Sequence, residues 1–117
     1  MKINKKISHL IISEKTKISE AIKKISNNNV GALIVAKNKF FLGYIQEGDV
    51  KKALLINNIN PSNSVKKIMN KSPFIIEHEI SDKEKIKKIK LKKRLRAPIL
   101  NKKNFIKGMI YHSKHPW

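Results

Sequence analysis

The sequence predicts an α+β fold of two tandem βαββα-type repeats, the second of which lacks its closing helix. The first observation is that residues 31–45, GALIVAKNKFFLGYI, align with residues 96–110, RAPILNKKNFIKGMI, at a constant separation of 65 positions. The second is that EAIKKI at residues 20–25 aligns with EKIKKI at residues 84–89, 64 positions later. Because a loop between helix and strand can absorb one residue, both halves are expected to share one architecture.

The first repeat shows helical periodicity followed by two short β-rich runs. Thr16 stands in the expected N-cap position, and four residues after it form an apolar stripe on one helical face: Ile18, Ala21, Ile22 and Ile25. The continuous apolar run at residues 33–35 predicts a strand buried on both faces, and residues 40–45 predict its neighbour. A second helix is expected to open at Gly48 and Asp49.

The second repeat follows a short connection. Pro61 breaks the chain, and residues 62–70 predict a short connecting helix. A strand is then expected at residues 74–76, and Ser81-Asp82-Lys83-Glu84 forms a capping box that starts the next helix. The strand pair recurs at residues 96–100 and 105–111, and the chain ends at Trp117, where the closing helix should begin. We therefore expect a first repeat at 1–61, a connecting segment at 62–72 and a second, degenerate repeat at 73–117.

The composition excludes several classes of protein. The chain of 117 residues contains no cysteine, which excludes disulfides, thiolate metal sites and cysteine nucleophiles. No run approaches the roughly 20 apolar residues of a membrane helix, so a cytoplasmic protein without membrane contact is expected.

The formal net charge of +19 makes a lysine-rich nucleic-acid-binding protein the alternative interpretation. Arg94 and Arg96 are the only arginines, however, and arginine is the residue that reads bases and clamps phosphates with two hydrogen bonds. A solvated lysine coat is therefore favoured over nucleic-acid binding.

No pattern of catalytic or metal-binding residues stands out. His112 and His115 would need further metal ligands, and Glu77 and Glu79 alternate along an expected strand in a way that a solvated edge explains better. The sequence has neither a P-loop nor a nucleophile elbow. We expect no enzymatic activity, no metal and no cofactor in this chain.

Residues 18–55, ISEAIKKISNNNVGALIVAKNKFFLGYIQEGDVKKALL, resemble a CBS domain almost from end to end. Residues 65–73, VKKIMNKSP, resemble the IM-x-x-x-P junction between the two repeats of a CBS-domain pair, or Bateman module. GDVKK at residues 48–52 is similar to CBS pairs that precede sugar-phosphate nucleotidyltransferase domains, and the glycine-rich nucleotide loop of those enzymes is absent here. The resemblance implies a regulatory module, a homodimer and a catalytic partner domain elsewhere.

The resemblance also implies a cleft between the repeats that holds an adenine nucleotide. Asp49 takes the family's ribose-binding position, and Gln46 takes the position of a hydroxyl residue. Gly43, Tyr44 and Ile45 form the strand that leads into the site. Thr16 is expected on the phosphate side.

The second repeat departs from the family pattern at the matching positions. Tyr111 is bulky where a small hydroxyl residue belongs, and Lys114 stands where ribose requires a carboxylate, although Gly108 is kept. We therefore expect one binding site at most. A purely structural dimerisation module, with no ligand, is the other interpretation that the resemblance leaves open.

Overall fold

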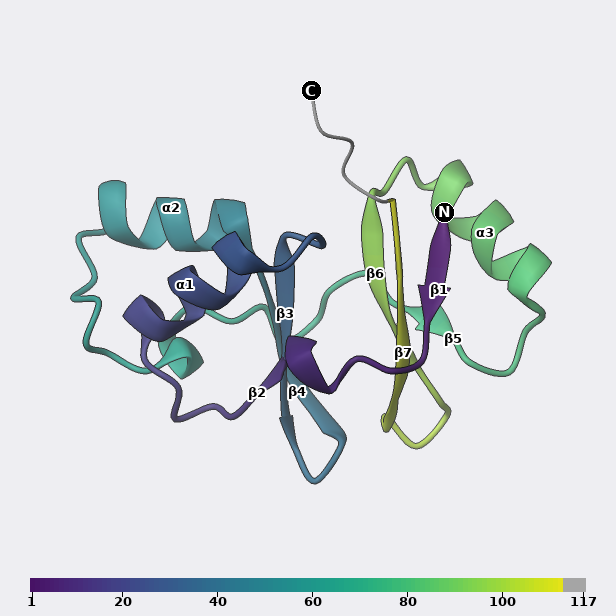
Figure 1. Ribbon diagram of the computed structural model, residues 1–117, viewed down its shortest axis with the longest axis horizontal. Helices are drawn as coiled ribbons and strands as arrows, with labels where there is room; N and C mark the ends of the chain where they lie inside the picture. Colours follow the sequence, from purple (N-terminus) through teal and green to yellow (C-terminus); the bar gives the residue numbers. More distant parts are fainter. Residues whose placement is uncertain (113–117) are drawn as a thin grey trace.

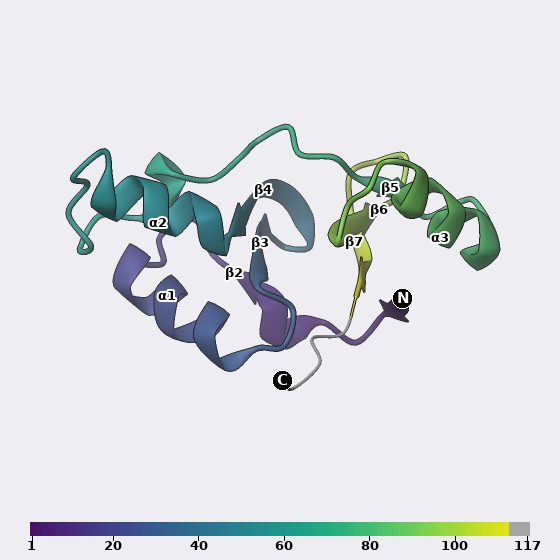
Figure 2. The ribbon, with the colours of Figure 1, turned by 90° about the horizontal axis from the view of Figure 1, so that it is seen from above.

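The computed structural model describes residues 1–112. The two halves of the chain lie side by side, and each places a small sheet toward the centre with its helices on the outside (Figure 1). Viewed from above, α1 (Ile18–Asn27) and α2 (Glu47–Leu55) cover one end of the molecule and α3 (Asp82–Leu91) covers the other (Figure 2). The α+β prediction is therefore confirmed.

The first half carries a three-stranded sheet in the order β2-β3-β4. Strand β2 pairs parallel with β3, and β3 pairs antiparallel with β4 through a hairpin. The elements are β2 (Ile11–Ile12), α1 (Ile18–Asn27), β3 (Ala32–Lys37), β4 (Phe40–Gln46) and α2 (Glu47–Leu55), preceded by the 3-10 helix η1 (Ser8–Leu10).

The second half carries a four-stranded sheet in the order β1-β7-β6-β5. Its elements are β5 (Ile76–Glu77), α3 (Asp82–Leu91), β6 (Arg96–Leu100) and β7 (Ile106–Tyr111). The fourth strand is β1 (Lys2–Asn4), which starts the chain and pairs antiparallel with β7. The N-terminal strand thus ties the first half to the sheet of the second. Within residues 1–112 this half has no counterpart of α2.

The two hairpins reproduce the sequence repeat in three dimensions. Each has a register shift, at Val35/Ala36 in the first half and at Ile99/Leu100 in the second. At the hairpin tips, Phe40 and Phe105 form a bridge, with ring centroids 5.9 Å apart and planes at 83°. These phenylalanines are 65 positions apart, so they are the same position of the two repeats and meet near the axis that relates the halves.

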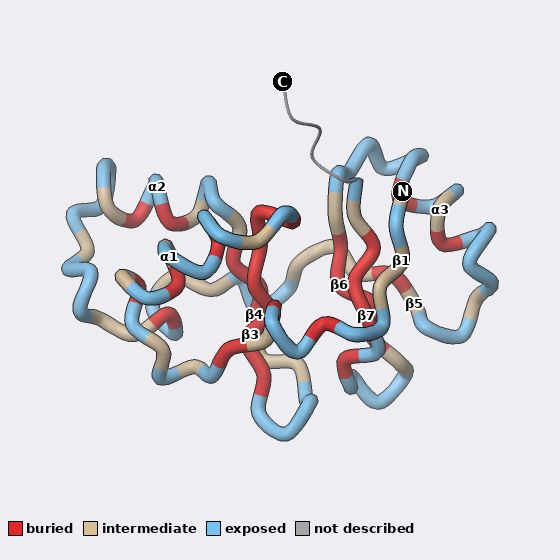
Figure 3. Tube along the Cα trace, viewed as in Figure 1, coloured by how far each residue is buried: buried red, intermediate tan, exposed pale blue. Residues whose placement is uncertain are grey.

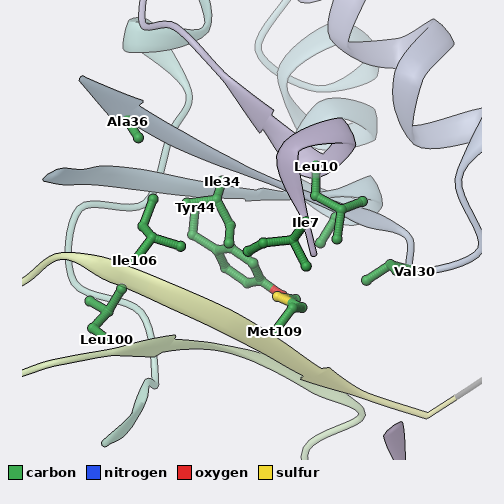
Figure 4. Packing of buried hydrophobic residues seen from close by; sticks show 10 residues of the cluster. Ile7, Leu10, Val30, Ile34, Ala36, Tyr44, Leu100, Ile106 and Met109 are labelled. Carbon is green, nitrogen blue, oxygen red and sulfur yellow. The ribbon is translucent and has the colours of Figure 1, made fainter. Parts of the chain in front are cut away.

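The core has a central part between the sheets and a lateral part under the helices of each half. Buried residues concentrate on the facing strands (Figure 3). The central part includes Ile34, Tyr44, Leu100, Ile106 and Met109, whose side chains meet between the sheets (Figure 4). Strand β3 contributes Ile34 to the central part and Leu33 and Val35 to the part under α1 and α2, which confirms the strand buried on both faces.

The connecting helix predicted at residues 62–70 is wrong, because only Val65–Lys67 forms a short 3-10 helix, η2. The backbone of this segment bonds to the first half instead of to itself. The Val65 N–H donates to the Thr16 carbonyl at 2.8 Å, and Tyr44 and Asn70 exchange both backbone hydrogen bonds. These long-range partners replace the intrahelical bonds that a helix would need.

Five element starts also differ from the prediction, two of them by one residue in strands, since β3 begins at Ala32 and β7 at Ile106. Helix α1 follows Lys17 in the N-cap position rather than Thr16, whose carbonyl is the acceptor for Val65. Helix α2 begins at Glu47, one residue before Gly48. Strand β5 covers Ile76–Glu77 rather than residues 74–76. The Ser81 cap is confirmed, since its hydroxyl accepts the Glu84 N–H at 3.2 Å.

In the part of the chain that is described, no helix has the length and apolar character required to cross a membrane.

Candidate functional site

A polar cleft of about 260 Å³ lies where the two halves meet. The first half contributes Tyr44 and Gln46, from the end of β4. The connecting segment contributes Asn70 and Ser72, and the second half contributes residues 73–74 and residues 93–96, which lead from α3 into β6. Three of the lining side chains are cations and none is an acid, so the cleft has the charge of an anion-binding site.

A hydrogen bond joins the two halves inside this cleft. The Arg96 guanidinium donates from Nη1 to the Gln46 amide oxygen Oε1 at 3.0 Å. Arg96 is the first residue of β6, and Gln46 is both the last residue of β4 and the N-cap of α2. The cleft is therefore closed at one point by a contact between an arginine and a neutral amide.

Asp49 lies at the start of α2 and acts there as a helix cap. Its Oδ2 accepts the Gln46 backbone N–H at 2.8 Å, which satisfies a donor that the helix leaves open. Asp49 lines a different depression, with Lys52, Asn57 and Lys67, and is not among the residues that line the cleft.

The structure brings two of the six predicted site residues, Tyr44 and Gln46, into the cleft. Ile45 is fully buried in the core under α1 and α2. Gly43 is covered by Met69, whose side-chain atoms would lie 2.6–2.9 Å from a Cβ at this position. Thr16 is half-buried beside the connecting segment, where its backbone binds Val65.

Tyr44 presents an unusual polar group to the central core. Its side chain extends from β4 toward Met109 of the opposite sheet (Figure 4), and the residue is 2% exposed. Within residues 1–112 its hydroxyl has no hydrogen-bond partner. Burial raises the pKa of this hydroxyl well above its usual value, although the charge of Arg96 acts in the opposite direction.

The cationic residues of the cleft were not among the predicted site residues. Arg94 and Arg96 are the only arginines of the chain, and both line this cleft. The sequence therefore contained a signal for these residues: two arginines stand close together in a chain whose other positively charged residues, histidines aside, are lysines. The Arg94 guanidinium lies 5.8 Å from the centre of the Phe74 ring, a cation–π contact that restricts its orientation.

At four of the ten positions that lie 65 residues away from those of the cleft, the residue is apolar or aromatic. These are Met109, Tyr111, Ile7 and Val30. All four belong to the central core or pack against it. Lys114, the expected counterpart of Asp49, lies outside the described residues. These four side chains therefore fill space that the polar cleft leaves open on its own side.

The strand expected around Glu77 and Glu79 is wrong in part, because β5 ends at Glu77. Glu77 accepts two hydrogen bonds from the Lys88 ammonium, both at 2.8 Å, and this contact lowers the pKa of its carboxyl. Glu79 accepts the Lys102 N–H at 3.1 Å. Within residues 1–112 no three His, Asp or Glu residues lie close enough together to hold a metal ion, and His115 lies outside that range.

The chain is similar to known proteins at the level of one domain. Residues 5–56 match the model of the CBS domain family. A curated relative, the arabinose 5-phosphate isomerase KdsD of Francisella tularensis subsp. tularensis (strain SCHU S4 / Schu 4), is 30% identical over 84 residues. That match covers 69% of this chain and 26% of the isomerase, so the chain spans about a quarter of the length of this relative. Because this relative is an isomerase, it gives no support to the predicted association with a sugar-phosphate nucleotidyltransferase domain.

Solved structures extend the likeness to the whole fold. A CBS domain protein from Streptococcus pneumoniae TIGR4 superposes with a TM-score of 0.76 at 12% identity, over 94% of this chain and 74% of that one. The CBS domain pair of protein MJ0100, solved with 5′-methylthioadenosine and S-adenosyl-L-methionine, gives 0.69 at 17% identity, over 87% of this chain and 80% of that one. The chain belongs to the CBS domain family, with its CBS domain at residues 5–56 and the fold of a CBS-domain pair over the described residues.

Proposed function

We propose that this chain is a non-catalytic regulatory module that binds one adenine nucleotide in the cleft between its two halves. The observation that carries the proposal is the polar cleft between the halves, lined by Tyr44, Gln46 and three cations among other residues. Its volume of about 260 Å³ is slightly below that of typical small-ligand sites, which measure about 300–1,000 Å³. A mononucleotide or a ligand of similar size therefore fits better than an extended polymer. We divide the module into repeats at 1–61 and 73–117, joined by residues 62–72.

The polar groups of the cleft suit a phosphorylated nucleoside. Asn70 and Ser72 offer donors and acceptors for a base or sugar, and Arg94 and Arg96 offer charge for a phosphate. The similar CBS pair of MJ0100 was solved with two adenosine compounds, which favours an adenosine-containing ligand, although neither compound carries a phosphate. The assignment of ribose to Asp49 stays a prediction, and it requires the carboxylate to turn away from the Gln46 N–H.

Calorimetric titration with AMP, ADP and ATP tests the proposal. Saturable binding of at least one nucleotide, abolished by a bulky residue in the cleft such as Ser72→Trp, is the expected result. Ser62→Trp is the matched control, because Ser62 is an exposed serine outside the cleft. If none of the three nucleotides binds, the proposal of nucleotide binding is contradicted and the interpretation as a purely structural module is favoured.

We further propose that the module serves an enzyme of sugar-phosphate metabolism, with an isomerase favoured by the curated relative. The proposal assigns the chemistry to another domain, so the chain alone is expected to leave arabinose 5-phosphate unchanged. Turnover of that compound by the purified chain would contradict the non-catalytic assignment.

We also propose that the module forms a homodimer through α1 and α2. A groove of about 280 Å³ between these helices has an apolar lining that includes Ile22, Val50, Leu54 and Leu55. Leu55 is 78% exposed in the single chain, and the adjacent Ile56 is 70% exposed. Sedimentation of the wild type and of Leu54→Asp tests this proposal: the wild type should sediment as a dimer and the variant as a folded monomer. A monomeric wild type would overturn it.

A further inference from the structure

We infer that the outer face of the second half binds an acidic amphipathic helix of a partner protein, in the place that α2 takes in the first half. The outer face is the side of the second sheet on which α3 packs. Four apolar residues lie at its surface: Met1, Ile3, Ile86 and Leu95. The inference concerns a protein partner, so it goes beyond the proposed binding of a nucleotide.

The two halves differ in the helices that cover the outer side of their sheets. In the first half α1 packs against β3 and α2 packs against β4, and Val50 and Ala53 of α2 are buried. In the second half α3 is the only α-helix among residues 1–112, and it lies alone at its end of the molecule (Figure 2). The outer core has nine buried residues in the first half and five in the described part of the second. Over β7, the counterpart of β4, the described residues supply no helix.

A pocket of about 340 Å³ lies where a counterpart of α2 would begin. Its lining includes Lys90 and His112, which align with Ser26 and Glu47 of the first repeat at separations of 64 and 65 positions. Glu47 is the first residue of α2, and Ser26 and Glu47 both line the groove between α1 and α2. The pocket therefore corresponds to one end of that groove, without the second helix that forms the groove in the first half.

The outer face presents apolar side chains that a helix can cover. Leu95 is 59% exposed and lines the pocket together with Met1. Ile86 is half-buried, and its counterpart Ile22 lines the groove against α2. Ile3 is also half-buried and packs against the outer core. An amphipathic helix covers such a surface with apolar residues at positions i, i+3, i+4 and i+7.

The charge of α3 favours an acidic occupant. Lys83, Lys87 and Lys90 are exposed, and their spacing of i, i+4 and i+7 places them along one side of the helix. Two of these positions are neutral in the first repeat, where Ser19 aligns with Lys83 and Ser26 with Lys90. We call these three residues the lysine row. Within residues 1–112 no member of the lysine row forms an ion pair with a carboxylate.

An acidic partner fits this surface better than a second copy of the chain. A second copy carries a net charge of +19, so like charges would oppose its approach to the lysine row. A helix with glutamates or aspartates beside its apolar stripe would pair its acids with the lysine row while the stripe covers Ile86 and Leu95. The charge of the surface thus identifies the occupant as an acidic amphipathic helix.

Synthetic peptides provide the test. The acidic probe is a fluorescein-labelled peptide of about 16 residues, since shorter isolated helices are marginal in water. It has leucine at i, i+3, i+4 and i+7 and glutamate at most other positions. A scrambled probe keeps the composition without the periodicity. In fluorescence anisotropy the acidic probe should bind at least about tenfold more tightly than the scrambled probe, because only the periodic sequence places its leucines on one face.

Two variants locate the binding site. Leu95→Asp places an acid in the pocket, and Lys90→Glu reverses one charge of the lysine row. Each should weaken binding of the acidic probe at least about tenfold, since like charges then face each other. The matched controls are Ile56→Asp, at a residue of the first half that is 70% exposed, and Lys24→Glu, in the last turn of α1. Both controls should bind as the wild type does, and circular dichroism should show that all four variants are folded.

Several results would overturn the inference. Equal affinity for the acidic and scrambled probes would show a general attraction to lysines. Unchanged affinity in both Leu95→Asp and Lys90→Glu, or an equal loss in the two controls, would place the binding elsewhere. Dissociation of a wild-type oligomer by Leu95→Asp, measured by sedimentation, would show that a second copy covers the outer face. Binding that appears only after removal of residues 113–117 would assign the face to the chain itself. No arm of the test uses a nucleotide, so a failure of nucleotide binding is a separate result.

Discussion

Arg96 of the second half donates a hydrogen bond to Gln46 of the first half, across the cleft that separates them. The same Gln46 donates its backbone N–H to Asp49 and so begins α2. A ligand that replaces Gln46 as the partner of Arg96 would therefore change the contacts of the N-cap residue of α2. This connection links the occupancy of the cleft to α2, one of the two helices that form the apolar groove.

Replacing Gln46 by serine removes the side-chain acceptor of Arg96 but keeps the backbone N–H that donates to Asp49. Gln46→Ser removes the acceptor of Arg96, so the free energy of unfolding should fall by about 1 kcal/mol. The affinity for AMP should rise at the same time, because Arg96 no longer exchanges one partner for another. Urea unfolding and calorimetry measure the two effects. A loss of affinity would show instead that the Gln46 side chain itself binds the ligand.

The hydroxyl of Tyr44 should lower the free energy of unfolding. It is buried and has no partner among residues 1–112, so Tyr44→Phe removes an unsatisfied polar atom while the ring is kept. We expect the free energy of unfolding to rise by about 1 kcal/mol, as for other unsatisfied buried groups. Tyr111→Phe, which changes a half-buried tyrosine of β7, is the control and should change stability less. Destabilisation by Tyr44→Phe would show that the hydroxyl has a partner in solution.

A side chain at Gly43 should conflict with Met69. A Cβ there would lie 2.9 Å from the Met69 Cβ and closer still to its Sδ, so movement of the methionine tip alone cannot relieve the contact. Gly43→Ala is expected to destabilise the chain by about 1–3 kcal/mol, the usual range for an overpacked core. In the Met69→Ala background the same change should cost less. Additive costs in this double-mutant cycle would rule out the contact as the cause.

Asp49 caps α2 and is also the predicted ribose position. Asp49→Ala removes the acceptor of the Gln46 N–H and is expected to lower the free energy of unfolding by about 1 kcal/mol. Glu20→Ala, in the first turn of α1, is the matched control. Asp49→Asn keeps an acceptor for the cap but loses the charge that accepts the ribose hydroxyls, so it should weaken AMP binding with little effect on stability. Unchanged affinity for AMP in Asp49→Asn would contradict the ribose assignment.

The ion pair between Glu77 and Lys88 should give a small, pH-dependent contribution. Lys88 lowers the folded-state pKa of Glu77, so the stabilisation is present above the unfolded value of about 4.5 and is lost as the pH falls through the lower folded value. Both side chains are about half exposed, so the double-mutant cycle of Glu77→Gln and Lys88→Gln should give less than about 1 kcal/mol at pH 7. The coupling should vanish once the pH lies below the lowered folded-state pKa of Glu77. A coupling that persists there would exclude the charge as its origin.

Periodicity predicted the elements whose burial follows a repeating pattern. The stripe of α1 and the apolar run of β3 were predictable because solvent exclusion alone determines them. The connecting segment was not, since its hydrogen bonds go to Thr16 and Tyr44, which are distant in sequence. The pairing of β1 with β7 was not predictable for the same reason, since the two strands lie at opposite ends of the described sequence.

Local sequence patterns also could not predict that a charged side chain would be buried. Lys85 aligns with Ala21 of the first repeat and is 5% exposed, yet it occupies this core position because its ammonium donates to the carbonyls of His78 and Ile80. The alignment of repeats predicted the helical position, but only the folded loop shows how the charge is satisfied. Arg94 and Arg96 are similar: their types stood out in the sequence, and the fold shows that they share a cleft.

The stoichiometry of nucleotide binding tests the central claim most directly. An asymmetric CBS pair, with one half's cleft open and polar and the other packed by Ile7, Val30 and Met109, should bind one AMP per chain in a calorimetric titration. Two equivalents of AMP per chain, or none, would contradict the account.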